Sequence, residues 1–245
     1  MSDRPAKMGT DDARGKDMNK RQLTIVGILM LLLAGMGAWY LTRLDAPVTG
    51  AAAPEAIDPG ERHTMGNPRA PVTLIEYASL VCPACAFVNA TTIPELKRRY
   101  IDTGKVFYVF RIRPIDPADF KAEGLAMCVP REKYFDAVDL LYRRQEEWGA
   151  EHMQEHGPGF TMDKQPRTDA GLIKLGRAMG MNEAKARRCM YDNDMHRVVD
   201  SIAGQGDIRY ALAGTPTIIV NGQTFPRVPR DIDDLATMID PLLAP

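Results

Sequence analysis

The sequence predicts an α/β domain with the element order β-α-β, a helical insertion, and β-β-α, preceded by one N-terminal transmembrane helix. Three observations lead to this prediction. Two β-rich runs, one starting at Val72 and one covering 105–112, flank a helical stretch. Residues from about 117 to 213 show helical spacing without a convincing strand. Residues 23–41 form an apolar run without a charge.

Chain length and charge limit the possible classes of function. The 245 residues are ample for a hydrophobic core. The 31 Lys and Arg residues nearly balance the 32 Asp and Glu residues, so nothing in the charge predicts a nucleic-acid partner. Four cysteines are too few for a disulfide-rich scaffold of this length, and each pair is therefore interpreted separately.

The stretch from Leu23 to Leu41 is the candidate membrane span. Its 19 uncharged residues suit the hydrocarbon core of a bilayer, because a helix rises ~1.5 Å per residue. A buried core helix is the alternative, which the all-round apolar surface and the terminal Trp39 and Tyr40 disfavour. Six basic residues precede the span and two lie in the 21 residues after it. The positive-inside rule therefore places the tail 1–22 in the cytoplasm and the rest outside it.

Signal cleavage is an alternative to a retained anchor. The small residues of "TGAAAPEA", Thr49 to Ala56, are of the kind that signal peptidase accepts. The apolar run is longer than a typical signal core, and these small residues begin several positions beyond its end, which favours retention. Residues 42–65 are then a Pro/Ala-rich tether, and 66–245 form one domain.

The first half of the domain predicts a βαβ unit. In "PVTLIEYAS" the side chains of Val72, Leu74 and Glu76 alternate with the intervening residues, which is typical of a strand. "KVFYVFRI" at 105–112 is a second β-rich run. The helix between them is expected to start near Pro83 and to run to about residue 100, with a kink at Pro94.

The second half predicts helices and then a return to sheet. Apolar residues at helical spacing occupy 134–142, 172–179 and 183–191, and a polar loop is expected over 148–169. The run "TPTIIVNG", 215–222, ends in Asn-Gly, which predicts a hairpin into "QTF". Residues 230–243 are expected to form a C-terminal helix.

Cys82 and Cys85 lie at the start of the first helix, in "CPAC". A structural zinc site needs four ligands, and the chain has no second C-x-x-C. Its H-x-x-x-H pair, His152 and His156, lies in the polar loop region with no obvious third ligand, which favours a solvated segment over a metal site. As a staple the pair would close a very short loop and would stabilise the fold little. A helix N-terminus favours a thiolate on the first sulfur and leaves the second one turn away, so a redox-active dithiol is the preferred interpretation.

These residues resemble the DsbA-like thiol-disulfide oxidoreductases of the bacterial envelope, a branch of the thioredoxin fold with a helical insertion. The resemblance covers Gly66 to the C-terminus and depends on "CPAC" and "GTPT". It implies that Thr215 and Pro216 form the X-cis-Pro loop beside the cysteines, which binds substrate together with Pro83 and Ala84. Together with the predicted span 23–41, it implies a single-pass inner-membrane protein with a periplasmic catalytic domain, or a soluble periplasmic protein after cleavage.

The resemblance also implies partners and a mechanism. The substrates would be exported cysteine-containing polypeptides, and a membrane or periplasmic redox partner would reset the dithiol. Neither a cofactor nor a metal is expected. Cys82 would form the mixed disulfide and Cys85 would resolve it.

Glu76 is the candidate proton-transfer residue. The family keeps a buried acid at this distance before the first cysteine, and a buried Glu is rare unless it is paired or functional. The alternative is an edge-strand glutamate that faces water. Lys105, at the start of the neighbouring strand, is a candidate partner for its carboxylate.

One departure from the family concerns Ala84, because the typical motif has histidine there. Without that imidazole the Cys82 thiolate is stabilised less, which predicts a milder oxidant. The direction of net electron flow therefore stays open between a dithiol oxidase, which is preferred, and a reductase or isomerase. A copper-handling protein that binds Cu(I) through the two thiolates is an alternative of a different class.

Cys128 and Cys189 lie in two predicted helices of the insertion. In an oxidising compartment a structural disulfide is the default for such a pair, and some DsbA-like proteins carry an additional, non-catalytic bridge. A second redox pair is the alternative, although neither cysteine has the tight spacing of a reactive dithiol.

Overall fold

The computed structural model describes residues 63–149 and 165–244, together with Ile25, Met36 and residues 30–32. The chain divides into two units, Met1–Gly50 and Ala51–Pro245. The five described residues of the first unit are helical and exposed. No helix among the residues described is both long and apolar enough to cross a membrane. The predicted tail 1–22, most of the predicted span 23–41 and residues 42–62 of the predicted tether lie outside the described residues.

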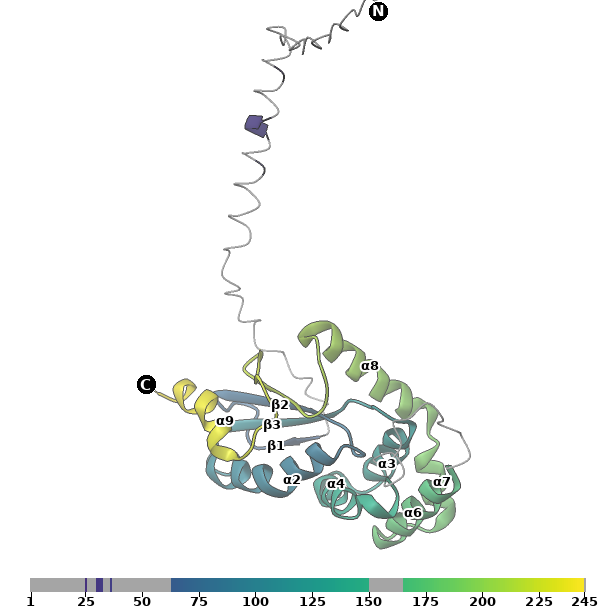
Figure 1. The fold of residues 1–245 in the computed structure, drawn as a ribbon. Coiled ribbons are helices and arrows are strands. Elements are labelled where there is room, and N and C mark those ends of the chain that lie inside the picture. Colours follow the sequence, from purple (N-terminus) through teal and green to yellow (C-terminus); the bar gives the residue numbers. More distant parts are fainter. Residues whose placement is uncertain (1–24, 26–29, 33–35, 37–62, 150–164, 245) are drawn as a thin grey trace, which may run out of the picture. The chain divides into compact units, whose positions relative to one another are not determined.

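The second unit contains a five-stranded mixed sheet in the order β1-β3-β2-β4-β5 (Figure 1). Its strands are β1 (Thr64–Met65), β2 (Val72–Ala78), β3 (Val106–Ile112), β4 (Thr217–Val220) and β5 (Gln223–Thr224). Strands β2 and β3 are parallel, as the predicted βαβ unit requires, and the other neighbours are antiparallel. The thioredoxin-like α/β class is confirmed.

Strand β1 was not predicted. Thr64 pairs with Val109 and Met65 with Tyr108, so the structure assigns these two residues to the sheet rather than to the tether. Two residues show no alternation of apolar and polar side chains, and the pairing partner is more than 40 positions away. This strand is identified only by its pairing with β3 in the folded structure.

The two faces of β2 pack against different cores. Val72, Leu74 and Ala78 belong to the larger core under the helices, whereas Ile75 and Tyr77 belong to a smaller core on the other face. This is the alternation that the sequence predicts. Glu76 is the single charged residue of β2, and its position in the alternation places it on the face with the larger core.

The helix after β2 is α2 (Pro83–Leu96), which continues into the π-helical η1 (Lys97–Ile101). Pro94 lies inside α2, and proline has no N–H to donate to the preceding turn. Three residues later, the N–H of Lys97 bonds both the Ile93 and Pro94 carbonyls as the helix changes to π geometry. The predicted end near residue 100 is therefore correct. Just after Pro94, where a kink was predicted, the structure shows a change of helix type.

Most helices of the insertion cluster at one end of the sheet, and the last of them extends back to contact β3 (Figure 1). Its helical segments are α3 (Pro117–Met127), η2 (Arg131–Lys133), α4 (Tyr134–Arg143), η3 (Gln145–Glu147), α6 (Gln165–Ala178), α7 (Glu183–Met190) and α8 (Asn193–Tyr210). The prediction of a loop over 148–169 was wrong at its end, because α6 already begins at Gln165.

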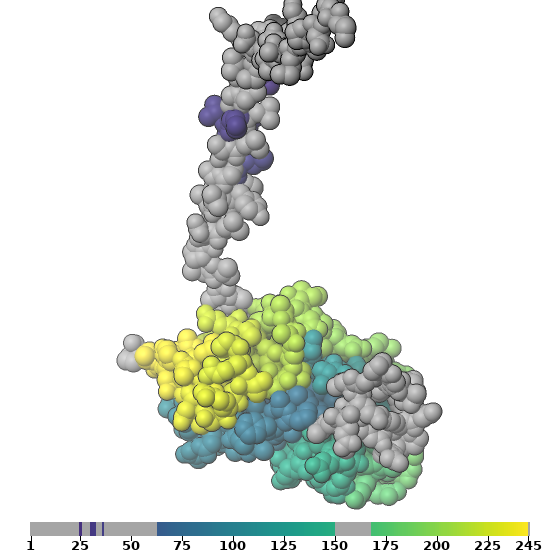
Figure 2. Space-filling view, in the orientation of Figure 1, coloured from purple at the N-terminus to yellow at the C-terminus, as the bar shows by residue number. Residues whose placement is uncertain are grey.

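The chain closes with the predicted hairpin and helix. Asn221 (φ 46°) and Gly222 (φ 83°) both have positive φ, the backbone of a two-residue hairpin turn between β4 and β5. Helix α9 (Ile232–Ile239) and the 3₁₀ turn η5 (Asp240–Leu242) follow. Figure 2 shows this C-terminal segment, in yellow, against the blue surface of the α2 region.

Candidate active site

Cys82 is the N-cap of α2, directly after the loop that leaves β2. Its backbone is extended (φ −79°, ψ 121°), and Pro83 occupies the first helical turn, where the missing N–H costs nothing. The Cys82 N–H donates to the Ser79 carbonyl at 3.2 Å, and its own carbonyl accepts the Ala86 N–H at 3.1 Å. The sulfur therefore lies at the helix N-terminus, which favours negative charge.

The environment lowers the pKa of the Cys82 thiol from 9.0 to about 5. The largest cause is a hydrogen bond from the Cys85 thiol; burial opposes it, and hydrogen bonds from the Thr215 side chain and from the Cys85 and Ala84 backbone add to it. In its protonated form the Cys82 thiol donates to the Thr215 carbonyl at 3.4 Å. Cys82 is thus an acidic thiol with 7% of its surface exposed.

Cys85 has the opposite environment. It is fully buried, and its pKa is raised well above the ordinary value, first by burial and then by the hydrogen bond to Cys82 and the charges of Cys82 and Glu76. Both cysteines are free thiols in this structure. Near neutral pH these opposite pKa shifts favour a thiolate at Cys82 beside a protonated thiol at Cys85, one helical turn away.

The loop before β4 completes the site. The Thr215–Pro216 peptide bond is cis, and the Thr215 carbonyl lies next to the Cys82 sulfur although 133 residues separate them. Pro216 is buried, whereas Pro83 is exposed and Ala84 half-buried beside it. The structure thus brings Cys82 together with Thr215, and leaves Pro83 and Ala84 on the accessible side.

Glu76 is buried, with 1% of its surface exposed. The Tyr108 hydroxyl donates to its carboxylate at 2.7 Å. Burial is the first cause that raises its pKa from 4.5 to about 7; the Tyr108 hydrogen bond lowers it, and the charge of Cys82 adds to the rise. The alternative of a water-facing edge glutamate is therefore excluded.

The suggested partner Lys105 was wrong. Lys105 is exposed and precedes β3, while Glu76 lies opposite Phe110 in the β2–β3 register. Five residues of strand separate the two positions, or about 16 Å at ~3.3 Å per residue. Tyr108 replaces Lys105 because it shares the face of the sheet with Glu76, a relation that the parallel register decides.

The thioredoxin family model matches residues 58–241 of the chain. The chain belongs to the thioredoxin family.

Relatives of this thioredoxin-family chain carry related names. One from Rickettsia bellii, provisionally named a protein-disulfide oxidoreductase, is 30% identical over 161 residues, covering 64% of this chain and 56% of the relative. One from Bacillus cereus, provisionally named disulfide bond formation protein D, is 25% identical over 187 residues, covering 73% and 77%. The chain spans less than two thirds of the length of the Rickettsia relatives.

Several solved structures superpose on this thioredoxin-family chain. Wolbachia pipientis α-DsbA1 superposes with a TM-score of 0.64 at 22% identity, covering 76% of this chain and 92% of that one. A protein-disulfide isomerase from Novosphingobium aromaticivorans gives 0.61 at 22% identity, covering 75% and 97%. At these identities the comparison establishes a DsbA-like fold.

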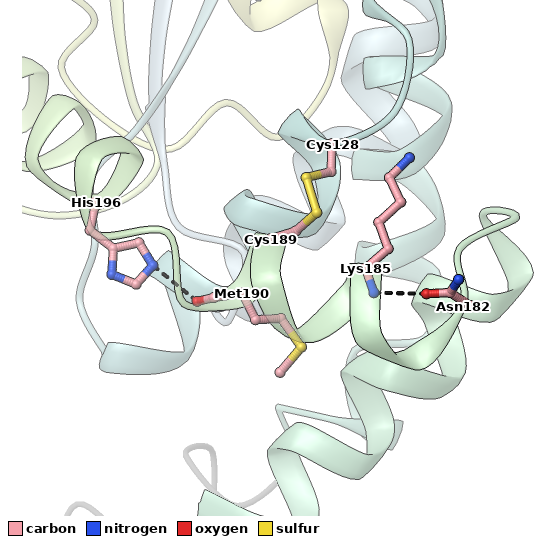
Figure 3. The surroundings of a disulfide bond; sticks show 6 residues. All are labelled: Cys128, Asn182, Lys185, Cys189, Met190 and His196. Carbon is pink, nitrogen blue, oxygen red and sulfur yellow. Dashed lines mark hydrogen bonds between the residues drawn. A yellow bond between two sulfur atoms is a disulfide. The ribbon is translucent and has the colours of Figure 1, made fainter.

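Cys128 and Cys189 are joined by a disulfide between the C-cap of α3 and the last turn of α7 (Figure 3). The two helices approach closely here: a Cβ atom on Gly124 would lie 2.2 Å from the Cys189 carbonyl oxygen, so only glycine fits. No group of three or more His, Cys, Asp or Glu side chains within the described parts of the domain is arranged to hold a metal ion.

Two further residues of the site were not predicted from the sequence. Tyr108 binds Glu76, and the buried Asp119 of α3 binds the loop before Cys82. The stretch "IDPADF" does carry a helix-start signal, an N-cap Asp116 followed by Pro117. That signal predicts where α3 begins, but not what its first turn contacts.

The raised pKa of Glu76 makes stability depend on pH. Between 4.5 and about 7 the folded protein keeps a proton that the unfolded chain releases, so this contribution to the free energy of unfolding falls as the pH rises through that window. Glu76→Gln cannot ionise. Its unfolding free energy is therefore expected to fall less between pH 5 and 8 than that of the parent protein, by up to ~3 kcal/mol, in urea titrations.

The exposed Glu132 provides the matched control for this experiment. Glu132→Gln removes a carboxylate of the same size from the surface, and should leave the pH dependence as it is in the parent. If Glu76→Gln and Glu132→Gln behave alike, Glu76 does not carry the raised pKa.

Proposed function

We propose that the chain is a thiol-disulfide oxidoreductase that oxidises pairs of cysteines in exported polypeptides. The observation that carries the proposal is the opposite displacement of the two thiol pKa values, down to about 5 at Cys82 and well above the ordinary value at Cys85. Neither a structural disulfide nor a surface thiol requires the pKa values of two neighbouring thiols to be shifted in opposite directions. A low-pKa sulfur is a good leaving group, which favours transfer of the disulfide to a substrate.

The reaction starts from the oxidised Cys82–Cys85 pair. A substrate thiolate attacks the Cys82 sulfur, which forms the mixed disulfide and releases the Cys85 sulfur as a thiolate. The second substrate thiolate then attacks the substrate sulfur of that bond and releases Cys82 as a thiolate. The substrate loses two electrons, and the reduced pair passes them to a redox partner.

Glu76 and the cis-proline loop have separate parts in this proposal. Glu76 lies close enough to Cys85 to raise its pKa, and its own pKa of about 7 suits a group that gives a proton to the departing Cys85 sulfur near neutral pH. Thr215 and Pro216 would hold an extended substrate beside Cys82, with Pro83 and Ala84 on the rim.

Equilibration of the purified domain in graded glutathione buffers tests the function. The potential is expected between those of thioredoxin, about −270 mV, and DsbA, about −120 mV, because alanine replaces the family's histidine at position 84. Ala84→His should add a stabilising group for the Cys82 thiolate and make the domain more oxidising. Ala90→His, on an exposed position further along α2, is the control.

Three results would contradict this proposal. A potential near or below that of thioredoxin, with insulin reduction faster than oxidation of a dithiol peptide, would assign the chain as a reductase. Stoichiometric Cu(I) retention without thiol exchange would assign it as a copper-handling protein. An equal effect of histidine at positions 84 and 90 would remove the explanation based on Ala84.

A further inference from the structure

The loop between β2 and Cys82 is held almost entirely by the helical insertion. Residues 79–81 are buried, and each of them makes a polar bond to an insertion side chain. The Tyr142 hydroxyl donates to the Ser79 carbonyl at 3.2 Å, and the Gln145 amide to the Leu80 carbonyl at 2.6 Å. Two further donors of this loop, the Ser79 hydroxyl and the Val81 N–H, bind Asp119.

The Asp119 carboxylate accepts hydrogen bonds both from the loop before Cys82 and from the backbone that leads into α3. The Ser79 hydroxyl lies 3.0 and 2.9 Å from its two carboxylate oxygens, and the Val81 N–H donates to it at 3.1 Å. On the other side the backbone N–H groups of Ile115 and Asp116 donate at 2.9 and 3.3 Å. The carboxylate has no exposed surface, and burial raises its pKa from 3.8 to about 6, while the hydrogen bonds that it accepts favour the ionised form.

We propose that Asp119 is a positioning residue for the reactive pair: its buried carboxylate fixes residues 79–81, and thereby the placement of the Cys82 sulfur at the N-terminus of α2. The inference takes the dithiol of the proposed function as the reactive centre. Val81 directly precedes Cys82, and the Ser79 carbonyl accepts the Cys82 N–H, so a shift of this loop moves the sulfur away from the groups that stabilise its thiolate.

The insertion provides a rigid base for this contact. Asp119 is the third helical residue of α3 and takes part in its capping box with Asp116, while the disulfide at Cys128 ties the other end of α3 to α7. Because both ends of α3 are fixed, the Asp119 carboxylate has a defined position and can in turn fix the position of residues 79–81. The helical insertion therefore acts on the chemistry of the site through Asp119.

The test compares Asp119→Asn with the parent in glutathione buffers at pH 7.5. Asparagine presents an N–H₂ group to donors, so residues 79–81 should loosen and the Cys82 thiolate should be less stabilised. The equilibrium constant for oxidation by the domain is expected to fall roughly tenfold, or ~30 mV. A purely structural role would destabilise the oxidised and reduced forms equally and would leave this constant unchanged.

Glu123→Gln is the matched control. Glu123 is a second buried carboxyl group of α3, one turn further on, and it accepts from the Tyr134 hydroxyl at 3.0 Å rather than from residues 79–81. This variant should change the melting temperature and leave the equilibrium constant within about twofold of the parent.

Ser79→Ala decides the question should Asp119→Asn not fold. It removes one donor, keeps the charge of Asp119, and is expected to lower the constant about threefold. Where Asp119→Asn does fold, combining the two changes should add little, because both break one contact. An unchanged constant in these variants overturns the inference alone. A raised constant overturns it too, because Asp119 would then act through its charge. A parent domain without thiol exchange would contradict the proposed function as well.

Discussion

Cys85→Ser is expected to accumulate mixed disulfides with other proteins in cells, whereas Cys82→Ser is expected to trap none. The reason is the difference between the two thiols. The Cys82 sulfur, with a pKa of about 5, is a thiolate at neutral pH and attacks a substrate disulfide. In the parent protein the Cys85 sulfur can release such a mixed disulfide by attacking the Cys82 sulfur, the reverse of the first step of the proposed reaction, and serine cannot replace it there. Both variants should lose oxidation of a dithiol peptide down to the uncatalysed rate.

The trapped complexes also test the proposal that the substrates are exported polypeptides. Non-reducing electrophoresis with identification of the partners measures both points, and the double variant with serine at positions 82 and 85 is the control for other thiol adducts. Partners that are exported polypeptides agree with the proposal. Cytosolic partners would contradict it, and trapping by Cys82→Ser would exchange the roles of the two sulfurs.

Replacing Cys128 and Cys189 together with serine is expected to lower the free energy of unfolding by about 4 kcal/mol. The bond spans 61 residues, and a loop of that length restricts the unfolded chain strongly in the chain-entropy model. For a domain of this size the melting temperature should fall by roughly 8–16 °C. Differential scanning calorimetry of the parent and the double variant measures the loss.

The active-site pair supplies the contrast for this measurement. Cys82→Ser with Cys85→Ser removes a pair that closes only a short loop, so its stability should change far less. That variant, purified from an oxidising compartment, should still contain one intramolecular disulfide. Two free thiols in a thiol titration would show that the bond between Cys128 and Cys189 does not form, and would remove the basis of the prediction.

Much of the fold could be predicted because its signals are local. The alternation in β2 identifies a strand with two different faces, and Pro83 after Cys82 marks the start of a helix within two residues. Asn221-Gly222 predicts the hairpin for the same reason, since Asn and Gly readily adopt the positive φ angles that a two-residue hairpin turn requires. Where the signal extends over too few residues, as in β1, the prediction fails.

The sequence alone therefore determined the location of the dithiol at a helix start, the βαβ order and the family. Only the tertiary structure decided which groups surround those cysteines: Thr215 beside Cys82, Tyr108 on Glu76, and Asp119 on the loop before the site. Helix starts and strands depend on the conformational propensities of a few neighbouring residues, so they can be predicted from a short stretch of sequence. These contacts join residues 32 to 133 positions apart, and they follow from how the sheet register and the packing of the insertion bring distant segments together.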